Sequence, residues 1–254
     1  MALSLMKSIY GVNSRNNSMF LDDNDSDCDN ERNTYGLSRS LNVLNKKNEG
    51  LQTGTTIVSI AYKDGVIMGA DSRSSVSSTY VANRLTNKLQ KLFDNVYIQR
   101  SGSSAHTQNI GDYVSHYLNI HSMELNELPR VETAAKLVQS IVYSNKNWVS
   151  ASIIVVGYDK YNGGSIYYCP MGATLAKKLP FAIAGSGSVY IYGFMDENYK
   201  ANLSKNDALK LVKRAVSLAI YRDGSSGGVV RTLVIDKNGC ERQTFEPDNI
   251  DAKQ

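Results

Sequence analysis

The chain changes character abruptly between residues 54 and 55, and this boundary limits what can fold. Residues 11–50 are rich in Asn, Asp and Ser, contain few aliphatic residues and show no hydrophobic periodicity. Such a segment cannot bury enough apolar surface to offset the entropy lost on ordering. From Thr55 onward, apolar residues recur at the spacings of strands and helices. We therefore expect residues 1–54 to be a disordered leader and residues 55–254 to form one folded domain.

The order of the periodic segments favours an α+β fold. Strand patterns bounded by turn residues lie at residues 56–62, 66–70, 96–100, 152–158, 165–169, 181–184, 229–235 and 240–245. Apolar residues spaced by three and four predict helices that include residues 110–118, 134–142 and 208–218. Strands in groups, separated by helices, favour antiparallel sheets with segregated helices over a parallel sheet with alternating helices. Two antiparallel sheets between two helix layers fit this order.

Composition argues against several classes of protein. The three cysteines, Cys28, Cys169 and Cys240, have no paired spacing, which favours a reducing compartment over a disulfide framework. The N-terminus lacks the regions of a signal peptide, and no stretch approaches the roughly 18 apolar residues of a membrane span. A net charge of +4, without a basic run that contains aromatic residues, gives no sign of nucleic-acid binding. We therefore expect neither a membrane nor a nucleic-acid partner.

Gly54 and Thr55 offer a particular chemistry at the boundary. If the bond between them is cut, Thr55 becomes an N-terminus that carries both a hydroxyl and a free α-amine. An α-amine titrates at about 7.7–8.0, so an appreciable neutral fraction can accept the hydroxyl proton near neutral pH. One residue then serves as both nucleophile and base. A Gly-Thr pair is common, however, and does not identify an enzyme by itself.

Asp71 and Lys88 are candidates to complete such a site. A hairpin that begins at Thr55 returns Asp71 close to that residue, and Lys88 enters a further strand after a short polar loop. An ammonium beside the threonine hydroxyl stabilises a developing alkoxide, and a carboxylate keeps the ammonium charged and oriented. The spacing is equally compatible with a surface ion-pair network of Asp71, Arg73 and Lys88. No Cys, His or carboxylate motif completes a metal site, so we expect no metal.

Several motifs together give the chain a specific resemblance. They occur in this order: Thr55-Thr-Ile, Gly69-Ala-Asp-Ser-Arg73, Asn83-Arg-x-Thr-x-Lys88, Arg100-Ser-Gly-Ser103, Gly185-Ser-Gly-Ser188 and Arg222-Asp-Gly-Ser-Ser-Gly-Gly228. Over residues 55–250 the chain resembles a eukaryotic proteasome core-particle β subunit, most closely the caspase-like catalytic type. Each motif alone is weak, and the combination is specific. The resemblance implies a four-layer α-β-β-α sandwich and a threonine endopeptidase that cleaves unfolded, ubiquitin-targeted proteins, preferably after acidic residues.

The resemblance also implies roles for individual residues. Thr55 is the nucleophile and, through its amine, the base, and Gly102 supplies the oxyanion N–H. The other residues expected at the catalytic centre are Asp71, Lys88, Ser186, Asp223 and Ser226. Arg100 is expected to pair with an acidic substrate side chain, although an exposed arginine at a strand end has the same spacing. The other expected substrate-binding residues are Ser75, Thr86, Gln90 and Ser104.

Two departures from the family pattern concern the pocket. The loop over residues 74–79 is one residue longer, which affects the alignment of Ser75. Gln90 and His106 stand where relatives are expected to have Thr and Asp, so both are expected to contact the pocket or a neighbouring subunit. Fine specificity is therefore where this chain is expected to differ.

The remaining implications concern processing and assembly. Residues 1–54 are expected to be a propeptide that Thr55 removes by attacking the Gly54 carbonyl, and Gly54 suits a strained turn because it lacks a Cβ. The chain is expected to join other α and β subunits in four stacked heptameric rings, to meet a regulatory particle indirectly, to need no cofactor, and to work in the cytoplasm and nucleus. Two alternatives remain: an unprocessed structural ring subunit, and a self-cleaving amidohydrolase that acts on small amides.

Overall fold

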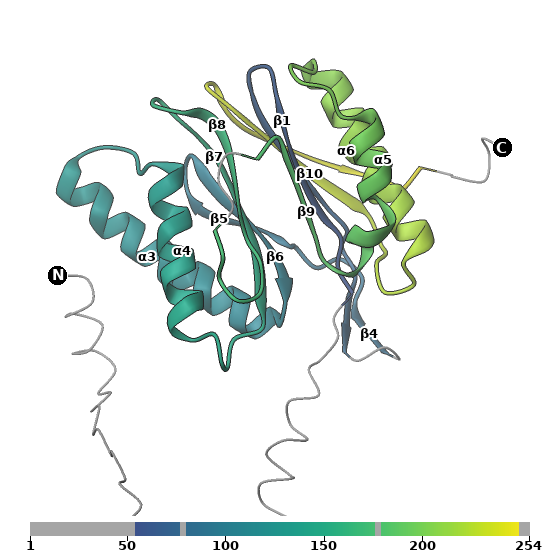
Figure 1. Ribbon diagram of the computed structural model, residues 1–254, viewed down its shortest axis with the longest axis horizontal. Helices are drawn as coiled ribbons and strands as arrows, with labels where there is room; N and C mark the ends of the chain where they lie inside the picture. The colour runs from purple at the N-terminus through teal and green to yellow at the C-terminus, as the bar shows by residue number, and fades with distance from the viewer. Residues whose placement is uncertain (1–53, 77–79, 176–178, 249–254) are drawn as a thin grey trace, which may run out of the picture. The chain divides into compact units, whose positions relative to one another are not determined.

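The computed structural model describes residues 54–76, 80–175 and 179–248, which belong to one compact unit (Figure 1). One antiparallel sheet has the strand order β11-β10-β2-β1-β9. It consists of β1 (Ile57–Tyr62), β2 (Gly65–Ala70), β9 (Phe181–Ala184), β10 (Val230–Asp236) and β11 (Gly239–Phe245). The second antiparallel sheet, in order, consists of β5 (Leu89–Phe93), β6 (Val96–Gly102), β7 (Ala151–Asp159) and β8 (Gly163–Cys169).

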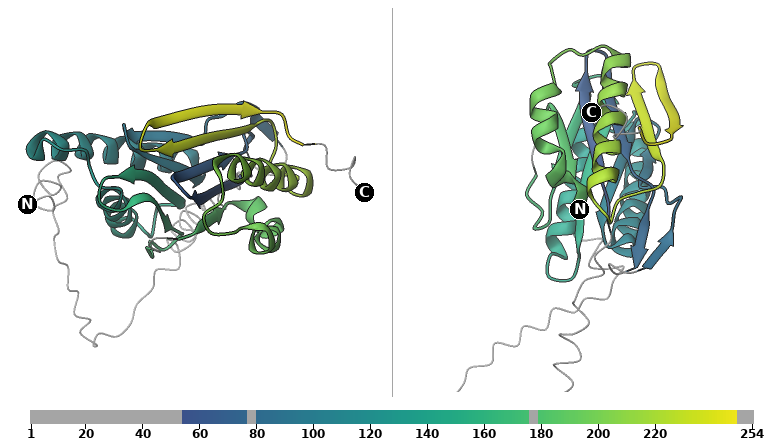
Figure 2. Two further views of the ribbon diagram at one scale, coloured as in Figure 1. Left: turned by 90° about the horizontal axis from the view of Figure 1, so that it is seen from above. Right: turned by 90° about the vertical axis from the view of Figure 1, so that its right-hand side faces the viewer.

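Helices cover the outer face of each sheet. Helices α3 (Ser104–Leu125) and α4 (Val131–Ser144) lie against the second sheet. The 3-10 helix η1 (Ser186–Tyr190) and helices α5 (Tyr192–Asn198) and α6 (Lys205–Arg222) lie on the side of the first sheet. Figures 1 and 2 show the two sheets in the centre and the helix pairs on opposite sides. The expected four-layer α-β-β-α sandwich is therefore confirmed.

Two apolar cores hold the layers together. The core between the sheets is built from residues of both, such as Ile57 and Met68 from the first and Ile154 and Val156 from the second, all with no exposed surface. The core beneath α6 includes Val58, Ile67 and Val212. Alternate residues of β1 thus point to different cores, as the two-residue period of a strand requires.

The longest predicted segments form as expected, and α6 shows why. The Ser204 Oγ accepts a hydrogen bond from the Asp207 N–H at 3.2 Å, so this serine caps the start of the helix. Ala208, Val212 and Ala215 of α6 are fully buried against the first sheet. The hairpin of β10 and β11 also turns at residues 236–239, as the Asn238-Gly239 pair predicts.

The segment after Arg73 differs from the expected loop. Ser74–Val76 (β3) and Tyr80–Asn83 (β4) pair as a short antiparallel hairpin, with an irregularity between Ser74 and Ser75. A β-bulge inserts one extra residue into a strand, so this irregularity is compatible with the longer segment that the resemblance leads us to expect here. Residues 1–53 of the predicted leader and residues 77–79 lie outside the described residues.

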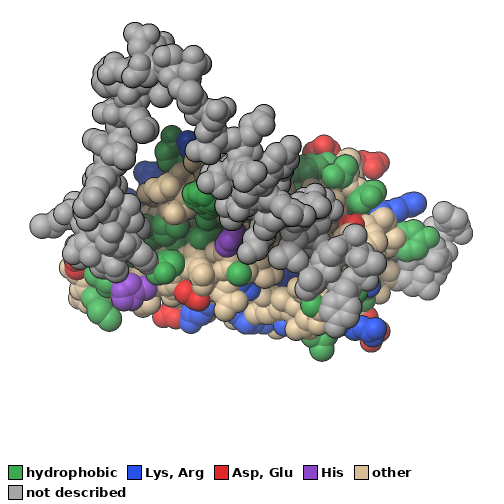
Figure 3. All heavy atoms as spheres, turned by 90° about the horizontal axis from the view of Figure 1, so that it is seen from below, with side chains coloured by type: hydrophobic (Ala, Val, Ile, Leu, Met, Phe, Trp, Pro, Cys, Tyr) green, Lys and Arg blue, Asp and Glu red, His purple; other side chains and the backbone are tan. Residues whose placement is uncertain are grey.

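The described residues contain no helix long and apolar enough to cross a membrane. On the face shown in Figure 3, hydrophobic, basic and acidic side chains are interspersed over the described surface.

Candidate active site

Thr55 lies immediately before β1, at one end of the sandwich, and is 4% exposed. Its hydroxyl donates a hydrogen bond to the Gly54 carbonyl oxygen at 2.7 Å. The Lys88 ammonium donates to the same oxygen at 3.1 Å. A hydroxyl and a cation therefore converge on the carbonyl group of the peptide bond that precedes Thr55.

Asp71 holds Lys88 in this position. The Lys88 Nζ lies 2.6 Å from the Asp71 Oδ1, and both side chains are buried. Asp71 also accepts hydrogen bonds from the backbone N–H groups of Thr56 (2.8 Å), Arg73 (3.2 Å) and Gly227 (3.1 Å). Since Asp71 follows β2 in the first sheet and Lys88 precedes β5 in the second, this ion pair joins the two sheets at the site.

Burial sets the protonation of the lysine. Desolvation lowers the pKa of Lys88 below the usual value of a lysine, while the Asp71 carboxylate and, more weakly, Asp223 oppose this change. Desolvation is the largest of these effects. The site therefore contains an ammonium that releases its proton more readily than an exposed lysine does.

A second buried carboxylate, Asp223, lies on the other side of Thr55. Its Oδ2 accepts hydrogen bonds from the hydroxyls of Ser186 and Ser226, each at 2.7 Å. The Ser186 Oγ in turn accepts the Thr55 backbone N–H at 3.1 Å. Asp223 caps the C-terminus of α6, where its own N–H donates to the Ala219 carbonyl oxygen at 2.7 Å. The helix end thus places a hydrogen-bond chain beside the nitrogen of Thr55.

Gly102 ends β6 and lies beside Gly54 in the same small cavity, of about 90 Å³. Its φ of +102° favours glycine. A Cβ there would stand 2.7 Å from the Ser150 carbonyl oxygen, so a side chain is also excluded by contact. Gly54 is constrained as well, because a Cβ at this position would collide with the backbone of Ser225.

Arg100 lines the same cavity as Thr55 and Lys88. Its Nη2 donates to the Asn87 carbonyl oxygen at 3.0 Å, whereas its Nε and Nη1 are buried and have no hydrogen-bond partner among the described residues. Burial lowers the pKa of the guanidinium, and the nearby Asp112 carboxylate partly opposes this. Arginine nevertheless stays protonated in proteins, so Arg100 contributes a positive charge with unused donors.

Only some of the other expected substrate-binding residues line this cavity. Thr86 and Ser104 line the cavity with Arg100. Ser75 is buried in β3 outside the cavity lining, and the Gln90 amide donates to the Asp112 Oδ1 at 2.8 Å instead of lining the cavity. His106 is half-buried, and its Nδ1 accepts the Ser150 N–H at 3.3 Å.

Sequence reasoning missed several residues of this site, among them Arg73 and Ser74, which also line the cavity. Thr107 and Gln108, from the first turn of α3, line the cavity, and Ser225 faces Gly54. Ser225 lies inside the motif that begins at Arg222, so that motif was a usable signal. Apolar spacing predicted α3 only from residue 110 onward, so it offered no reason to choose the polar residues at the start of the helix.

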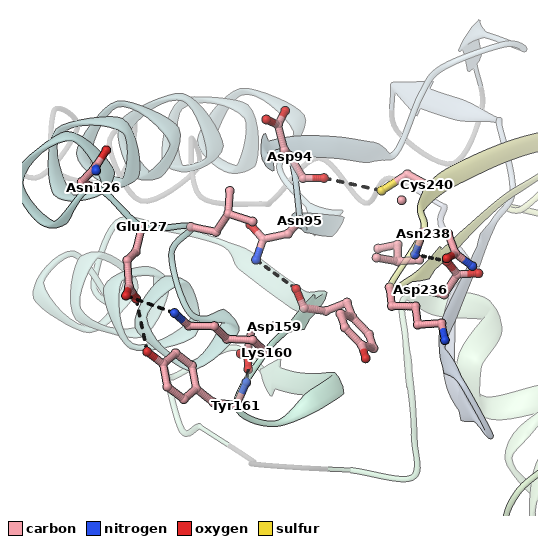
Figure 4. Close-up of a pocket in the computed structure, with 15 residues that line it drawn as sticks. Asp94, Asn95, Asn126, Glu127, Asp159, Lys160, Tyr161, Asp236, Asn238 and Cys240 are labelled. Carbon is pink, nitrogen blue, oxygen red and sulfur yellow. Dashed lines mark hydrogen bonds and ion pairs between the residues drawn. The ribbon is translucent and has the colours of Figure 1, made fainter.

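Two larger cavities are also present. One, of about 780 Å³, adjoins Gly54, Gly102 and Ser186. The other, of about 710 Å³, is lined by the turns after β5, β7 and β10 and by the segment after α3 (Figure 4). No group of three or more His, Cys, Asp or Glu side chains among the described residues could hold a metal ion.

Two antiparallel sheets between helix layers, with a threonine just before the first strand, define the fold of the N-terminal nucleophile hydrolases. Residues 51–235 match the family model "Proteasome subunit". The chain is 49% identical to the proteasome subunit beta type-6 of Dictyostelium discoideum over 78% of this chain and 91% of that one. It is 44% identical to the proteasome subunit beta type-1 of Saccharomyces cerevisiae over 85% and 98% of the two chains.

The chain therefore belongs to the proteasome subunit family, and it is a β subunit of the core particle. As such it assembles with other α and β subunits of that particle. This confirms the expected family and its assembly partners. The roles of the individual site residues stay predictions.

Proposed function

We propose that this chain is a catalytic β subunit, a threonine endopeptidase that removes its own leader at Gly54–Thr55 and cleaves polypeptides after acidic residues. The observation that carries the proposal is the continuous set of contacts from the Thr55 hydroxyl to the Gly54 carbonyl, Lys88 and Asp71. A ring subunit that acts only as a structural element does not require a buried cation aimed at one particular carbonyl oxygen.

The contacts at Gly54 support self-cleavage. The Thr55 Oγ attacks the Gly54 carbonyl carbon, and the Lys88 ammonium at 3.1 Å stabilises the negative charge that develops on the carbonyl oxygen. The C–N bond to Thr55 breaks, the nitrogen takes up a proton, and the leader is held as an ester on Oγ. Water then hydrolyses this ester, which releases the leader and leaves Thr55 with a free α-amine.

The freed amine acts as the base for other substrates. It accepts the Oγ proton as Oγ attacks the substrate carbonyl, and later donates a proton to the departing amine. The Ser186 hydroxyl accepts the N–H of this nitrogen at 3.1 Å and donates to the Asp223 Oδ2 at 2.7 Å, and we propose that this chain of hydrogen bonds orients the amine. We assign the oxyanion N–H to Gly102. Water finally hydrolyses the acyl-enzyme ester.

Arg100 supports cleavage after Glu or Asp. Its Nε and Nη1 are buried without a hydrogen-bond partner in the part of the chain that the structure describes, and a substrate carboxylate would relieve the desolvation cost of these donors. We propose that Thr86 and Ser104 complete this pocket, and that the active chain works in the cytoplasm and nucleus.

Purified core particles that contain this chain test the proposal. We expect the mature chain to begin at Thr55 by mass spectrometry and the particles to cleave peptides that end in Glu before the reporter group. Thr55→Ala should retain the leader and abolish this cleavage. A wild-type chain in assembled particles that still begins before Thr55 indicates the structural alternative, and activity only on small amides indicates the amidohydrolase alternative.

A further inference from the structure

Gln99 is a fully buried amide in the apolar core between the two sheets. Its side chain leaves β6 of the second sheet and reaches β1 and β2 of the first. Many apolar side chains are buried in this core, for example Ile57, Met68 and Ile154. An amide in such a place is costly unless its polar atoms are paired.

All the donors of this amide are used. The Gln99 Nε2 donates to the carbonyl oxygens of Val58 at 3.0 Å and Gly69 at 2.9 Å. Its Oε1 accepts the hydroxyl of Ser59, itself fully buried, at 2.6 Å. A primary amide has two N–H donors, so the side chain is held from three directions by the opposite sheet.

The strands that Gln99 joins are the strands that carry the site. Val58 and Ser59 lie three and four residues after Thr55, and β2 ends directly before Asp71. On the other sheet, Gln99 is followed by Arg100, whose N–H donates to the Lys88 carbonyl oxygen at 3.1 Å. The nucleophile and Asp71 thus lie on one side of this bridge, and Lys88 lies on the other.

Apolar contacts between sheets are not directional, so they resist sliding only through packing. Hydrogen bonds from Gln99 fix one position of β6 against β1 and β2. We propose that Gln99 is a positioning residue. It fixes the position of one sheet relative to the other and thereby the distance between the Lys88 ammonium and Thr55. This inference rests on the proposed function of Thr55.

The test compares Gln99→Met with a control in the same core, Met68→Leu, in assembled core particles. Both changes nearly conserve volume, but only the first removes the three hydrogen bonds. We expect Gln99→Met to lower kcat for a Glu-ending peptide roughly tenfold, since small misplacements of reacting groups have large effects. KM should stay within about twofold, and the acid limb of the kcat–pH profile should move, because the charge of Lys88, which is bonded to the Gly54 carbonyl next to the Thr55 nitrogen, would act on the freed amine from a changed position. Met68→Leu should change neither.

Equal losses of kcat in both variants, in proportion to their loss of thermal stability, overturn the proposal, as does an unchanged kcat in Gln99→Met. If Gln99→Met does not assemble, Ser59→Ala removes one of the three bonds and should give a smaller fall in kcat with the same movement of the pH profile. An unchanged pH profile in Ser59→Ala then contradicts the proposal.

A structural measurement separates this inference from the proposed function. In cryo-electron microscopy maps of variant particles, we expect a changed separation of Lys88 Nζ from the Thr55 side chain in Gln99→Met but not in Met68→Leu. If wild-type particles lack cleavage after Glu, the proposed function fails while this measurement still decides whether Gln99 positions the sheets. An unchanged separation overturns the inference.

Discussion

The two ends of the sandwich present polar side chains in opposite ways. At the end that carries Thr55, Asp71 and Lys88 are buried beside a cavity of only about 90 Å³. At the other end, a cavity of about 710 Å³ has Glu127, Lys160 and Tyr161 bonded to one another on its rim (Figure 4). A large cavity lies at each end, since the cavity of about 780 Å³ adjoins Gly54 and Gly102, so cavity size does not distinguish the catalytic end from the far end.

Burial explains the contrast. Lys160 and Glu127 are 63% and 47% exposed, and water screens such a pair, so it contributes little. The same type of pair, made by Lys88 and Asp71, is desolvated, so its charges act strongly on nearby groups. A cation that stabilises charge on a reacting carbonyl group is therefore effective at the end that carries Thr55, where Lys88 is buried, and not at the far end.

Removal of the buried cation is expected to have the largest effect. Lys88→Met should reduce cleavage of a Glu-ending peptide by roughly a thousandfold or more and should retain the leader, because Gly54 loses the ammonium at its carbonyl oxygen and Asp71 keeps an unpaired buried charge. Lys160→Met is the matched control and should leave both rate and processing unchanged. Normal leader removal in Lys88→Met, measured by mass spectrometry, would show that the lysine is dispensable.

Arg100 tests the selectivity of the catalytic end. Arg100→Ala should lower kcat/KM for a Glu-ending peptide roughly 10- to 100-fold and spare a Leu-ending one, because one charge-assisted pair is lost. Arg130→Ala is the matched control, since Arg130 lies 3.8 Å over the Tyr161 ring, beside the far cavity. Equal losses on both peptides would assign Arg100 to folding and not to specificity.

The lowered pKa of Lys88 predicts an alkaline limit to activity. As pH rises through this pKa, the ammonium loses its proton and its pairing with Asp71, so kcat should fall at a lower pH than the usual lysine value of about 10.4 permits. The contribution of Lys88 to the free energy of unfolding should instead increase as pH rises through this range. In that window the unfolded lysine binds more protons than the folded one, so the contribution of this group to the free energy of unfolding rises with pH.

The measurement is a kcat–pH profile of assembled particles, with sedimentation at each pH to verify assembly. An alkaline limb at or above the usual lysine range would contradict the role of burial. This effect is smaller than that of removing the side chain, because Lys88 still fills its place when neutral.

The sequence was sufficient for the fold but not for the fine structure of the site. Apolar periodicity located α6 and most strands of both sheets, since these elements bury continuous faces. It did not bound β5, which was expected only as a further strand after Lys88, and β11 is mostly exposed. Periodicity did not predict the hairpin of β3 and β4, because these short strands contain few aliphatic residues and show no alternation.

The site itself depended on long-range contacts. Spacing alone could not distinguish a catalytic pair of Asp71 and Lys88 from a surface ion pair, and only their burial separates these readings. The Gln99 bridge had no signal at all, because its partners Val58 and Gly69 are contacted through backbone oxygens, which any residue type would supply. The partner of Gln90 could not be predicted for a different reason. Its hydrogen bond to the Asp112 side chain depends on how α3 packs on β5.

The smallest effect is expected at the far end. Hydrogen bonds from Lys160 and Tyr161, with the charge of Lys160, hold the pKa of Glu127 below its usual range. All three groups remain in contact with water, so this shift has little influence beyond them. Glu127→Gln should therefore leave kcat, KM and leader removal unchanged within replicate scatter, while Asp71→Asn at the buried end abolishes activity. A change in kcat caused by Glu127→Gln would mean that the two ends are coupled, and the contrast between them would then have to be explained by something other than burial.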